Sequence, residues 1–284
     1  MDNVIEMSNV TKCYSDFKLN NIDINVKKGF VTGFIGPNGS GKSTTIKLLM
    51  NLIQKQSGTI EIFGMDNITC EKDIKSRIGF VYDEFCFFEH LSINSNEKII
   101  APFYENWNHE LFKSYLHKFQ LNPKKRLSKL SKGMKTKFSL AVALSHNADL
   151  LIMDEPTAGL DPIFRRELLN ILYDLMQDEN KSIFFSTHIT SDLDKIADYI
   201  TFINKGEIIF SKSTNDIFDN YKIVKGSKEL LSNIDESLLI GMKTNRFGFE
   251  GLTTNEQKLT TQFNDSIIID NANLEDIMVF YSNS

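Results

Sequence analysis

Apolar and polar residues alternate along the N-terminal part of the chain. Within residues 3–31, Ile5 and Met7 are apolar, whereas Glu6 and Ser8 are polar. A period of two is typical of antiparallel strands that have one face in the core and the other in solvent. The chain is therefore predicted to begin with a partly exposed antiparallel sheet.

Farther along, short apolar runs alternate with segments in which apolar residues recur three and four positions apart. The runs predict buried strands, and the wider spacing predicts helices. This alternation is typical of an α/β fold, in which helices cover both faces of a largely parallel sheet. The predicted strands lie at residues 30–35, 59–63, 78–82, 150–153 and 182–186. The predicted helices lie at residues 42–53 and 191–197 and after Pro162, and a hairpin is expected at 199–210.

Two further parts of the chain have different patterns. Residues 92–146 show helical spacing, which predicts a helical insertion at about 84–147 within a first domain over residues 1–212. Short strands and a final helix at 274–281 then predict a small α+β appendage, which we assign to a second domain over residues 213–284. The strands expected in this appendage lie at residues 221–224, 237–242 and 266–269.

The composition is that of an ordinary globular protein. Of the 284 residues, 41% are hydrophobic and 24% are charged, which excludes a collagen-like or wholly disordered chain. The three cysteines are far apart and form no CxxC pair, so neither a disulfide framework nor a cysteine-rich zinc site is expected. Because neither a secretory signal nor an apolar run of roughly 18–20 residues is visible, we predict a cytoplasmic protein.

The net charge of −5 conceals an uneven distribution. Residues 111–147 contain nine lysine and arginine residues and no acidic residue, so this stretch has a local charge of +9. Such a stretch can attract nucleic acid or nucleotide phosphates, or it can be a solvated helical face. The motifs around it must decide between these interpretations.

A glycine-rich segment follows the strand predicted at 30–35 and precedes the helix predicted at 42–53. It fits the GxxxxGK[ST] pattern of phosphate-binding loops. Glycines let backbone N–H groups approach phosphate oxygens, and the helix N-terminus favours negative charge. Lys42 offers a cation to the outer phosphates, and Ser43 offers a hydroxyl to Mg²⁺. The residues predicted to bind the nucleotide here are Gly36, Pro37, Asn38, Gly39, Ser40, Gly41, Lys42, Ser43 and Thr44.

The apolar strand predicted at 150–153 leads into two acidic residues, Asp154 and Glu155. A carboxylate at the end of a buried strand can hold Mg²⁺, and its neighbour can polarise an attacking water. Because the pair follows a phosphate-binding loop in the chain, it indicates nucleotide hydrolysis rather than binding alone.

In this order the motifs resemble the ATP-binding subunit of ABC transporters, and the resemblance covers about the first 210 residues. It implies the P-loop ABC ATPase fold, with a mixed sheet core, an N-terminal antiparallel β subdomain and an inserted helical subdomain. The matching segments are the loop at 36–44, the signature-like LSKGM at 130–134, the acidic strand ending at 154–155, the turn at 158–161 and Thr187-His188.

The resemblance implies roles for single residues around the nucleotide. Tyr14 would stack on adenine, and Asp154 would hold Mg²⁺ together with Ser43. Glu155 would be the general base, and His188 would contact the γ-phosphate and position the attacking water.

Three more residues would act between subunits. Ser131 and Gly133 would reach the γ-phosphate of the ATP held by the opposite subunit, and Asp161 would communicate across the interface. Hydrolysis would therefore require a head-to-tail homodimer or heterodimer with two ATP molecules between its subunits.

The sequence departs from the common family pattern in two segments. Where the family usually has a glutamine that touches Mg²⁺, this chain has Asp83, or Glu84 if the alignment slips by one. The signature reads LSKGM rather than LSGGQ. Both departures resemble ATPases that serve ABC-2-type membrane subunits, a group that exports drugs, antibiotics and bacteriocins.

The predicted function is thus an ATPase subunit that uses ATP and Mg²⁺ to power a separate integral membrane permease. It would lie on the inner face of the cell membrane through that permease, and no nucleic acid is expected as a partner. The alternative is a non-transport ABC ATPase that acts on ribosomes or nucleic acid, for which the basic stretch is the only support. The cluster of Phe85, Phe87 and Phe88 is either core of the helical subdomain or part of the groove that receives the permease.

Overall fold

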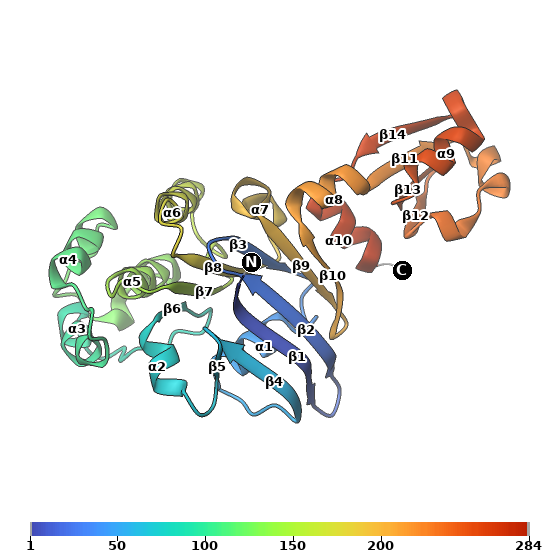
Figure 1. Cartoon of the computed structure of the whole chain (residues 1–284). Coiled ribbons are helices and arrows are strands. Elements are labelled where there is room, and N and C mark those ends of the chain that lie inside the picture. The colour runs from blue at the N-terminus through green and yellow to red at the C-terminus, as the bar shows by residue number, and fades with distance from the viewer. Residues whose placement is uncertain (1, 283–284) are drawn as a thin grey trace.

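The computed structural model describes residues 2–282, and its strands form three separate sheets. Two of these sheets pack together in the body of the molecule, with a group of helices at one side (Figure 1). The third sheet belongs to the C-terminal part of the chain and projects from the opposite side (Figure 1). In the part of the chain that is described, no helix is long and apolar enough to cross a membrane.

The N-terminal sheet is antiparallel and has the strand order β2-β1-β4-β5. Ile5 and Met7 are buried, while Glu6 and Ser8 are exposed, so the alternation in the sequence reports the two faces of this sheet. The strands are β1 (Asn3–Cys13), β2 (Lys18–Lys27), β4 (Ser57–Ile62) and β5 (Met65–Asp66).

The central sheet has the order β10-β9-β3-β8-β7-β6, in which all neighbouring strands are parallel except β10 and β9. All residues of β3, β7 and β8 are buried, which explains why these strands appear in the sequence as continuous apolar runs. The strands are β3 (Val31–Ile35), β6 (Ile78–Val81), β7 (Leu150–Asp154), β8 (Ser182–Thr187), β9 (Tyr199–Asn204) and β10 (Glu207–Ser213).

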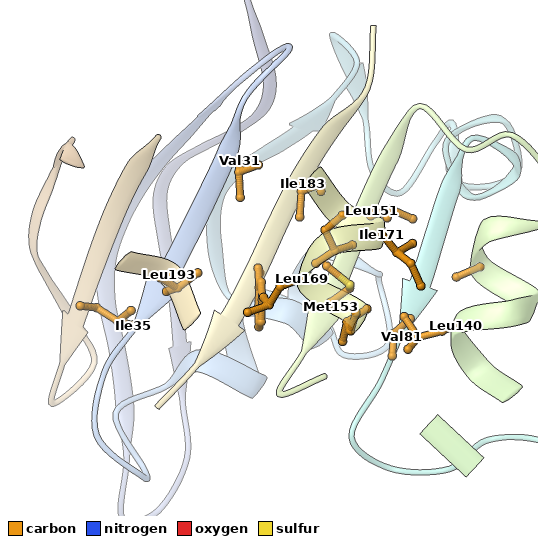
Figure 2. Close-up of a cluster of buried hydrophobic side chains, with 14 of the residues drawn as sticks. Val31, Ile35, Val81, Leu140, Leu151, Met153, Leu169, Ile171, Ile183 and Leu193 are labelled. Atoms are coloured by element: carbon orange, nitrogen blue, oxygen red, sulfur yellow. The ribbon is translucent and has the colours of Figure 1, made fainter. Parts of the chain in front are cut away.

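Both faces of the central sheet are covered. On one face, Leu151 and Met153 of β7 lie in a cluster with Leu169 of α6 and Leu193 of α7 (Figure 2). On the other face, Ile152 belongs to the cluster that contains side chains of α1 and of the N-terminal sheet. The helices that pack on the sheet are α1 (Lys42–Leu49), α2 (Glu71–Ser76), α6 (Pro162–Leu175) and α7 (Thr190–Ile196).

The inserted helical segment lies at the β6 edge of the central sheet (Figure 1). Phe85 and Phe87 pack on the buried Phe138, with ring centroids 6.4 and 4.9 Å from its own, whereas Phe88 is 49% exposed. The aromatic cluster therefore divides between core and surface. The elements of the segment are α3 (Ile93–Ile100), η1 (Ala101–Phe103), α4 (His109–Lys118), η2 (Leu127–Lys129) and α5 (Lys132–Leu144).

The C-terminal part contains an antiparallel sheet with the order β12-β13-β11-β14. Its last helix returns to the central body, where Asn204 donates a hydrogen bond to the carbonyl of Tyr281 at 3.1 Å. The elements are α8 (Thr214–Asn220), β11 (Lys222–Gly226), η3 (Lys228–Asn233), η4 (Glu236–Leu238), β12 (Gly241–Thr244), β13 (Phe249–Thr253), α9 (Glu256–Phe263), η5 (Asn264–Ser266), β14 (Ile267–Asn271) and α10 (Leu274–Ser282).

The predicted strand at 237–242 is wrong for most of its length. Its first residues belong to η4, because Asp235 caps this turn by accepting a hydrogen bond from the backbone of Ser237. The sequence pattern does not predict strand β13, because Gly251 interrupts its apolar residues. The glycine allows close approach of the neighbouring strand, since an added Cβ would lie 3.1 Å from the carbonyl oxygen of Gly241.

His146 is a buried histidine in the helical segment. Its ring stacks on Tyr104 with centroids 3.9 Å apart, and neither ring nitrogen has a hydrogen-bond partner among the described residues. Burial lowers the pKa of His146 to about 4. The folded protein therefore excludes a proton that the unfolded chain, in which the histidine pKa is near 6.5, binds readily.

We expect this histidine to make folding pH-dependent. As the pH falls from 7 to 5, the unfolded state gains a proton at His146 that the folded state does not, so the free energy of unfolding falls by about 2 kcal/mol from this residue. His146→Phe keeps the stacking on Tyr104 and should remove that part of the pH dependence. Urea unfolding at both pH values measures it, and identical pH dependence in both proteins would contradict the expectation.

Candidate functional site

A cavity of about 690 Å³ lies where β3, β7 and β8 end, which is the usual position of ligand sites in parallel sheets. Its wall combines the loop after β3, the residues that follow β7 and β8, and one residue from the start of α5. The lining residues are Asp16, Phe17, Asn38, Gly39, Gly41, Lys42, Ser43, Thr44, Asp83, Lys132, Glu155, Ala158 and His188.

The loop between β3 and α1 needs its glycines for steric reasons. Gly39 and Gly41 have φ angles of 78° and 116°, which residues with a side chain rarely adopt. A Cβ on Gly36 would lie 2.3 Å from the carbonyl oxygen of Ile203. The glycines therefore allow the backbone to turn beside the cavity and to enter α1 with its first N–H groups free for an anion.

Lys42 begins α1 and is buried at the inner end of this loop. Its Nζ donates to the carbonyl oxygens of Gly36 at 2.8 Å and Pro37 at 3.3 Å, and lies 3.6 Å from Oε1 of Glu155. Burial lowers the pKa of Lys42, while the negative charges of Glu155 and Asp154 oppose that shift. The loop thus places the ammonium group of Lys42 close to the carboxylates of Glu155 and Asp154.

Asp154 ends β7 and is almost completely buried. Its Oδ1 accepts a hydrogen bond from the hydroxyl of Ser186 on β8, while its buried Oδ2 has no hydrogen-bond partner among the described residues. Burial raises the pKa of Asp154, and the nearby hydroxyl groups of Ser186 and Ser43 oppose this shift. A buried carboxylate oxygen without a partner, close to a serine hydroxyl, fits the oxygen ligands that Mg²⁺ prefers.

Glu155 lies at the centre of the site. Its Oε1 faces Lys42, and its Oε2 lies 2.8 Å from Nδ1 of His188 and accepts a hydrogen bond from the backbone N–H of His188 at 3.3 Å. The backbone of Glu155 has φ 49°, a conformation that is strained for a residue with a side chain and often occurs at active sites. Its N–H donates to the carbonyl of Ser186 at 3.0 Å, which anchors this conformation to β8. The carboxylate is therefore oriented from both sides.

The residues predicted to act between subunits lie outside this cavity. Ser131 caps α5 by accepting a hydrogen bond from the N–H of Met134 at 3.3 Å, and Gly133 lies in the first turn of α5. Asp161 caps α6 by accepting from the N–H groups of Ile163 and Phe164, and these hydrogen bonds lower its pKa. Each of these residues thus has a local structural role at a helix start.

Tyr14 is 47% exposed and does not line the cavity; its N–H donates to the carbonyl of Phe17 at 2.7 Å. Phe17, which no motif in the sequence marks, is the aromatic side chain of this loop that lines the cavity. Its position in the same short loop as Tyr14 was the only sequence signal available. Stacking of Tyr14 on adenine stays a prediction.

Asp83 does line the cavity, but its Oδ1 is engaged by Nζ of Lys132 at 3.0 Å. In the sequence, Lys132 stands out only as one lysine of the basic stretch and as the lysine of LSKGM. The sequence does not show that it reaches the cavity, because Lys132 and Asp83 lie 49 residues apart in the chain.

Comparison with known proteins identifies the family. The sequence profile of the ABC transporter family matches residues 19–158. The bacitracin transport ATP-binding protein of Bacillus licheniformis is 37% identical over 214 residues, which cover 74% of this chain and 69% of that protein. The chain belongs to the ABC transporter family. A lantibiotic transport ATP-binding protein of Streptococcus pyogenes is 35% identical over 212 residues, which cover 74% of this chain and 90% of that protein.

Solved structures confirm the ABC ATPase fold. An ATP-binding subunit of an ABC transporter matches with a TM-score of 0.70 and 24% identity over 76% of this chain and 92% of its own. A dimeric ATP-binding cassette bound to ADP and Pi matches with a TM-score of 0.66 and 23% identity over 74% of this chain and 98% of its own. The family match and the relatives above confirm the predictions of an ABC transporter ATP-binding subunit and of ATPase activity.

Several lysines of the basic stretch have partners within this ABC ATPase. Lys113 pairs with Glu110, Lys135 pairs with Glu89 at 2.9 Å, and Lys137 lies over the ring of Phe164. Together with the Asp83 pair of Lys132, these contacts account for four of the nine basic residues. The local charge of +9 therefore does not require nucleic acid as a partner.

Proposed function

We propose that this ABC ATPase hydrolyses MgATP in the cavity beside the loop at 36–44. The observation that carries the proposal is the carboxylate of Glu155, held between Lys42 and His188 at the mouth of a phosphate-binding loop. A carboxylate oriented in this way can accept a proton from a water that attacks the γ-phosphate. His188 keeps Glu155 in place and lies where it can contact the same phosphate.

The bound nucleotide would be held by the loop together with the residues around it. Lys42 would exchange its contacts to Gly36 and Glu155 for contacts to the outer phosphates, and the N–H groups at the start of α1 would bind the phosphate oxygens. Mg²⁺, when bound, would neutralise phosphate charge, and its ligands would be Ser43 and the unpartnered Oδ2 of Asp154, with Asp83 as the third candidate.

Productive hydrolysis would require two subunits. Ser131 and Gly133 lie at the start of α5 and do not line their own subunit's cavity, which leaves them free to face the ATP of a partner. Asp161 starts α6 close to the turn that carries Glu155, so it can relay contacts at that interface. We therefore propose a head-to-tail dimer around two ATP molecules, either homomeric or heteromeric.

The relatives support an export function. Two of them are named for transport of bacitracin and of a lantibiotic, which are peptide antibiotics. We propose that residues 1–212 form the ATPase domain, that residues 213–284 form an accessory domain, and that the protein powers a separate permease that exports an antibiotic or a related peptide. The ATPase would then lie at the inner face of the membrane.

Co-expression with an integral membrane protein from a neighbouring gene tests the proposal. Affinity purification of the ATPase in mild detergent should recover that membrane protein, and cells that contain both should survive higher concentrations of a peptide antibiotic than cells with the ATPase variant Glu155→Gln. Recovery of the ATPase alone, with equal survival of both strains across a panel of peptide antibiotics, would refute an export role.

A further inference from the structure

Two of the residues at which this chain departs from the family pattern contact each other. Asp83 follows β6, and Lys132 is the first residue of α5 and the unusual lysine of LSKGM. Their side chains form an ion pair with Nζ and Oδ1 3.0 Å apart. The pair ties the helical segment to the edge of the central sheet at the level of the nucleotide cavity.

Both members of this ion pair line the cavity. Among the lining residues, Lys42 and Lys132 are the two lysines. Lys42 is already balanced by Glu155 at 3.6 Å and by the nearby Asp154. Lys132 is thus the second cation of the cavity, and Asp83 is its counter-charge.

The ion pair can be broken at little cost. The side chains of Lys132 and Asp83 are 63% and 45% exposed, so water screens their attraction and replaces the contact easily. The stem of Lys132 passes the turn after Glu155, where a Cβ on Gly159 would lie 3.7 Å from its Cδ. The stem of the lysine therefore runs beside this turn, while its ammonium group can change partner.

We propose that Lys132 is a second phosphate-binding lysine that changes partner when nucleotide binds. Without nucleotide it pairs with Asp83; with nucleotide it binds a phosphate oxygen of the triphosphate in the cavity that it lines. The triphosphate brings several negative charges that attract Lys132, and charge-assisted contacts to phosphate are stronger than an exposed ion pair. The inference rests on the proposed binding of ATP in this cavity.

This exchange of partners would change the contacts of the residues proposed to form the subunit interface. Lys132 lies between Ser131 and Gly133, the residues proposed to meet the ATP of the partner. When Lys132 leaves Asp83 for a phosphate, the first turn of α5 loses its tie to the β6 edge and gains one to the nucleotide. Occupancy of one cavity thus helps to place the contact residues for the other.

Nucleotide affinity of the dilute, monomeric protein tests the phosphate contact. Lys132→Met should weaken binding of a fluorescent ATP analogue with Mg²⁺ about tenfold, the loss expected for one charge-assisted contact, and should reduce the salt dependence of binding. Asp83→Asn removes the partner that competes with the phosphates for Lys132, so Lys132→Met should cost at least as much affinity in the Asp83→Asn background as in the wild type. Lys135→Met is the matched control. Lys135 lies in α5, as Lys132 does, and also forms an ion pair, with Glu89, but it does not line the cavity.

Zero-length cross-linking of the wild-type protein tests the change of partner directly. A carbodiimide should join Asp83 to Lys132 without nucleotide, and a saturating non-hydrolysable ATP analogue should reduce the yield of that cross-link several-fold. The cross-link between Glu89 and Lys135 should keep its yield and serves as the internal control. Peptide mass spectrometry measures both cross-links.

Three results separate the possible failures. Wild-type protein that binds no ATP overturns the proposed function itself. Wild-type binding with unchanged affinity in Lys132→Met, or an unchanged Asp83–Lys132 cross-link, overturns the role of Lys132 alone. Effects that occur only at concentrations at which the protein dimerises assign the phosphate to the partner's ATP and overturn the contact within one subunit.

Discussion

Glu155→Gln is expected to lower the rate of ATP hydrolysis by about 10²–10⁴-fold, the range of general-base contributions. The amide keeps the size of the side chain and can still contact Lys42 and His188, but it cannot accept a proton from water. ATP binding should therefore persist, and the variant should accumulate as an ATP-dependent dimer. Phosphate release measures the rate, and size-exclusion chromatography with and without MgATP measures the dimer.

Glu89→Gln is the matched control for this substitution. Glu89 also pairs with a lysine, at 2.9 Å from Lys135, but it lies outside the cavity. The substitution should leave the rate of hydrolysis unchanged, because an exposed ion pair contributes little to the stability of the fold. If Glu155→Gln turned over ATP at the wild-type rate, Glu155 would not be the base, and the site would need another proton acceptor.

Lys42→Met is expected to weaken MgATP binding by about 10²-fold, because it removes the buried cation of the loop and its charged contacts to the outer phosphates. It also leaves the carboxylates of Asp154 and Glu155 next to each other without their shared cation, which adds repulsion toward the triphosphate. Isothermal titration with a non-hydrolysable ATP analogue measures the affinity.

Lys47→Met is the matched control, because it removes another lysine of α1 and leaves Lys42 in place. Lys47 lies in the same helix and pairs with Glu84 at 3.5 Å, but it does not line the cavity. Its affinity for ATP should stay within about twofold of the wild type, since this exposed pair is weak. Equal affinities of the two variants would show that Lys42 does not bind the phosphates.

The phosphate-binding loop could be predicted from the sequence because its chemistry is local. Contiguous residues supply the turn, the helix start and the cation, and an unbroken apolar run marks the buried strand before them. The acidic end of β7 could be predicted for the same reason. In the C-terminal part, β13 was missed because its pattern is short and contains a glycine, so pairing with its neighbours, rather than local pattern, stabilises it.

The amino-acid sequence by itself determined the α/β class, the phosphate-binding loop and the candidate acids, since each depends on residues that are neighbours in the chain. Tertiary structure alone decided which side chains meet. The strand order places the ends of β3, β7 and β8 together, and only then does Glu155 lie between Lys42 and His188. The pairing of Asp83 with Lys132 likewise depends on how the helical segment packs against β6, because contacts between distant residues follow from packing that no local pattern encodes.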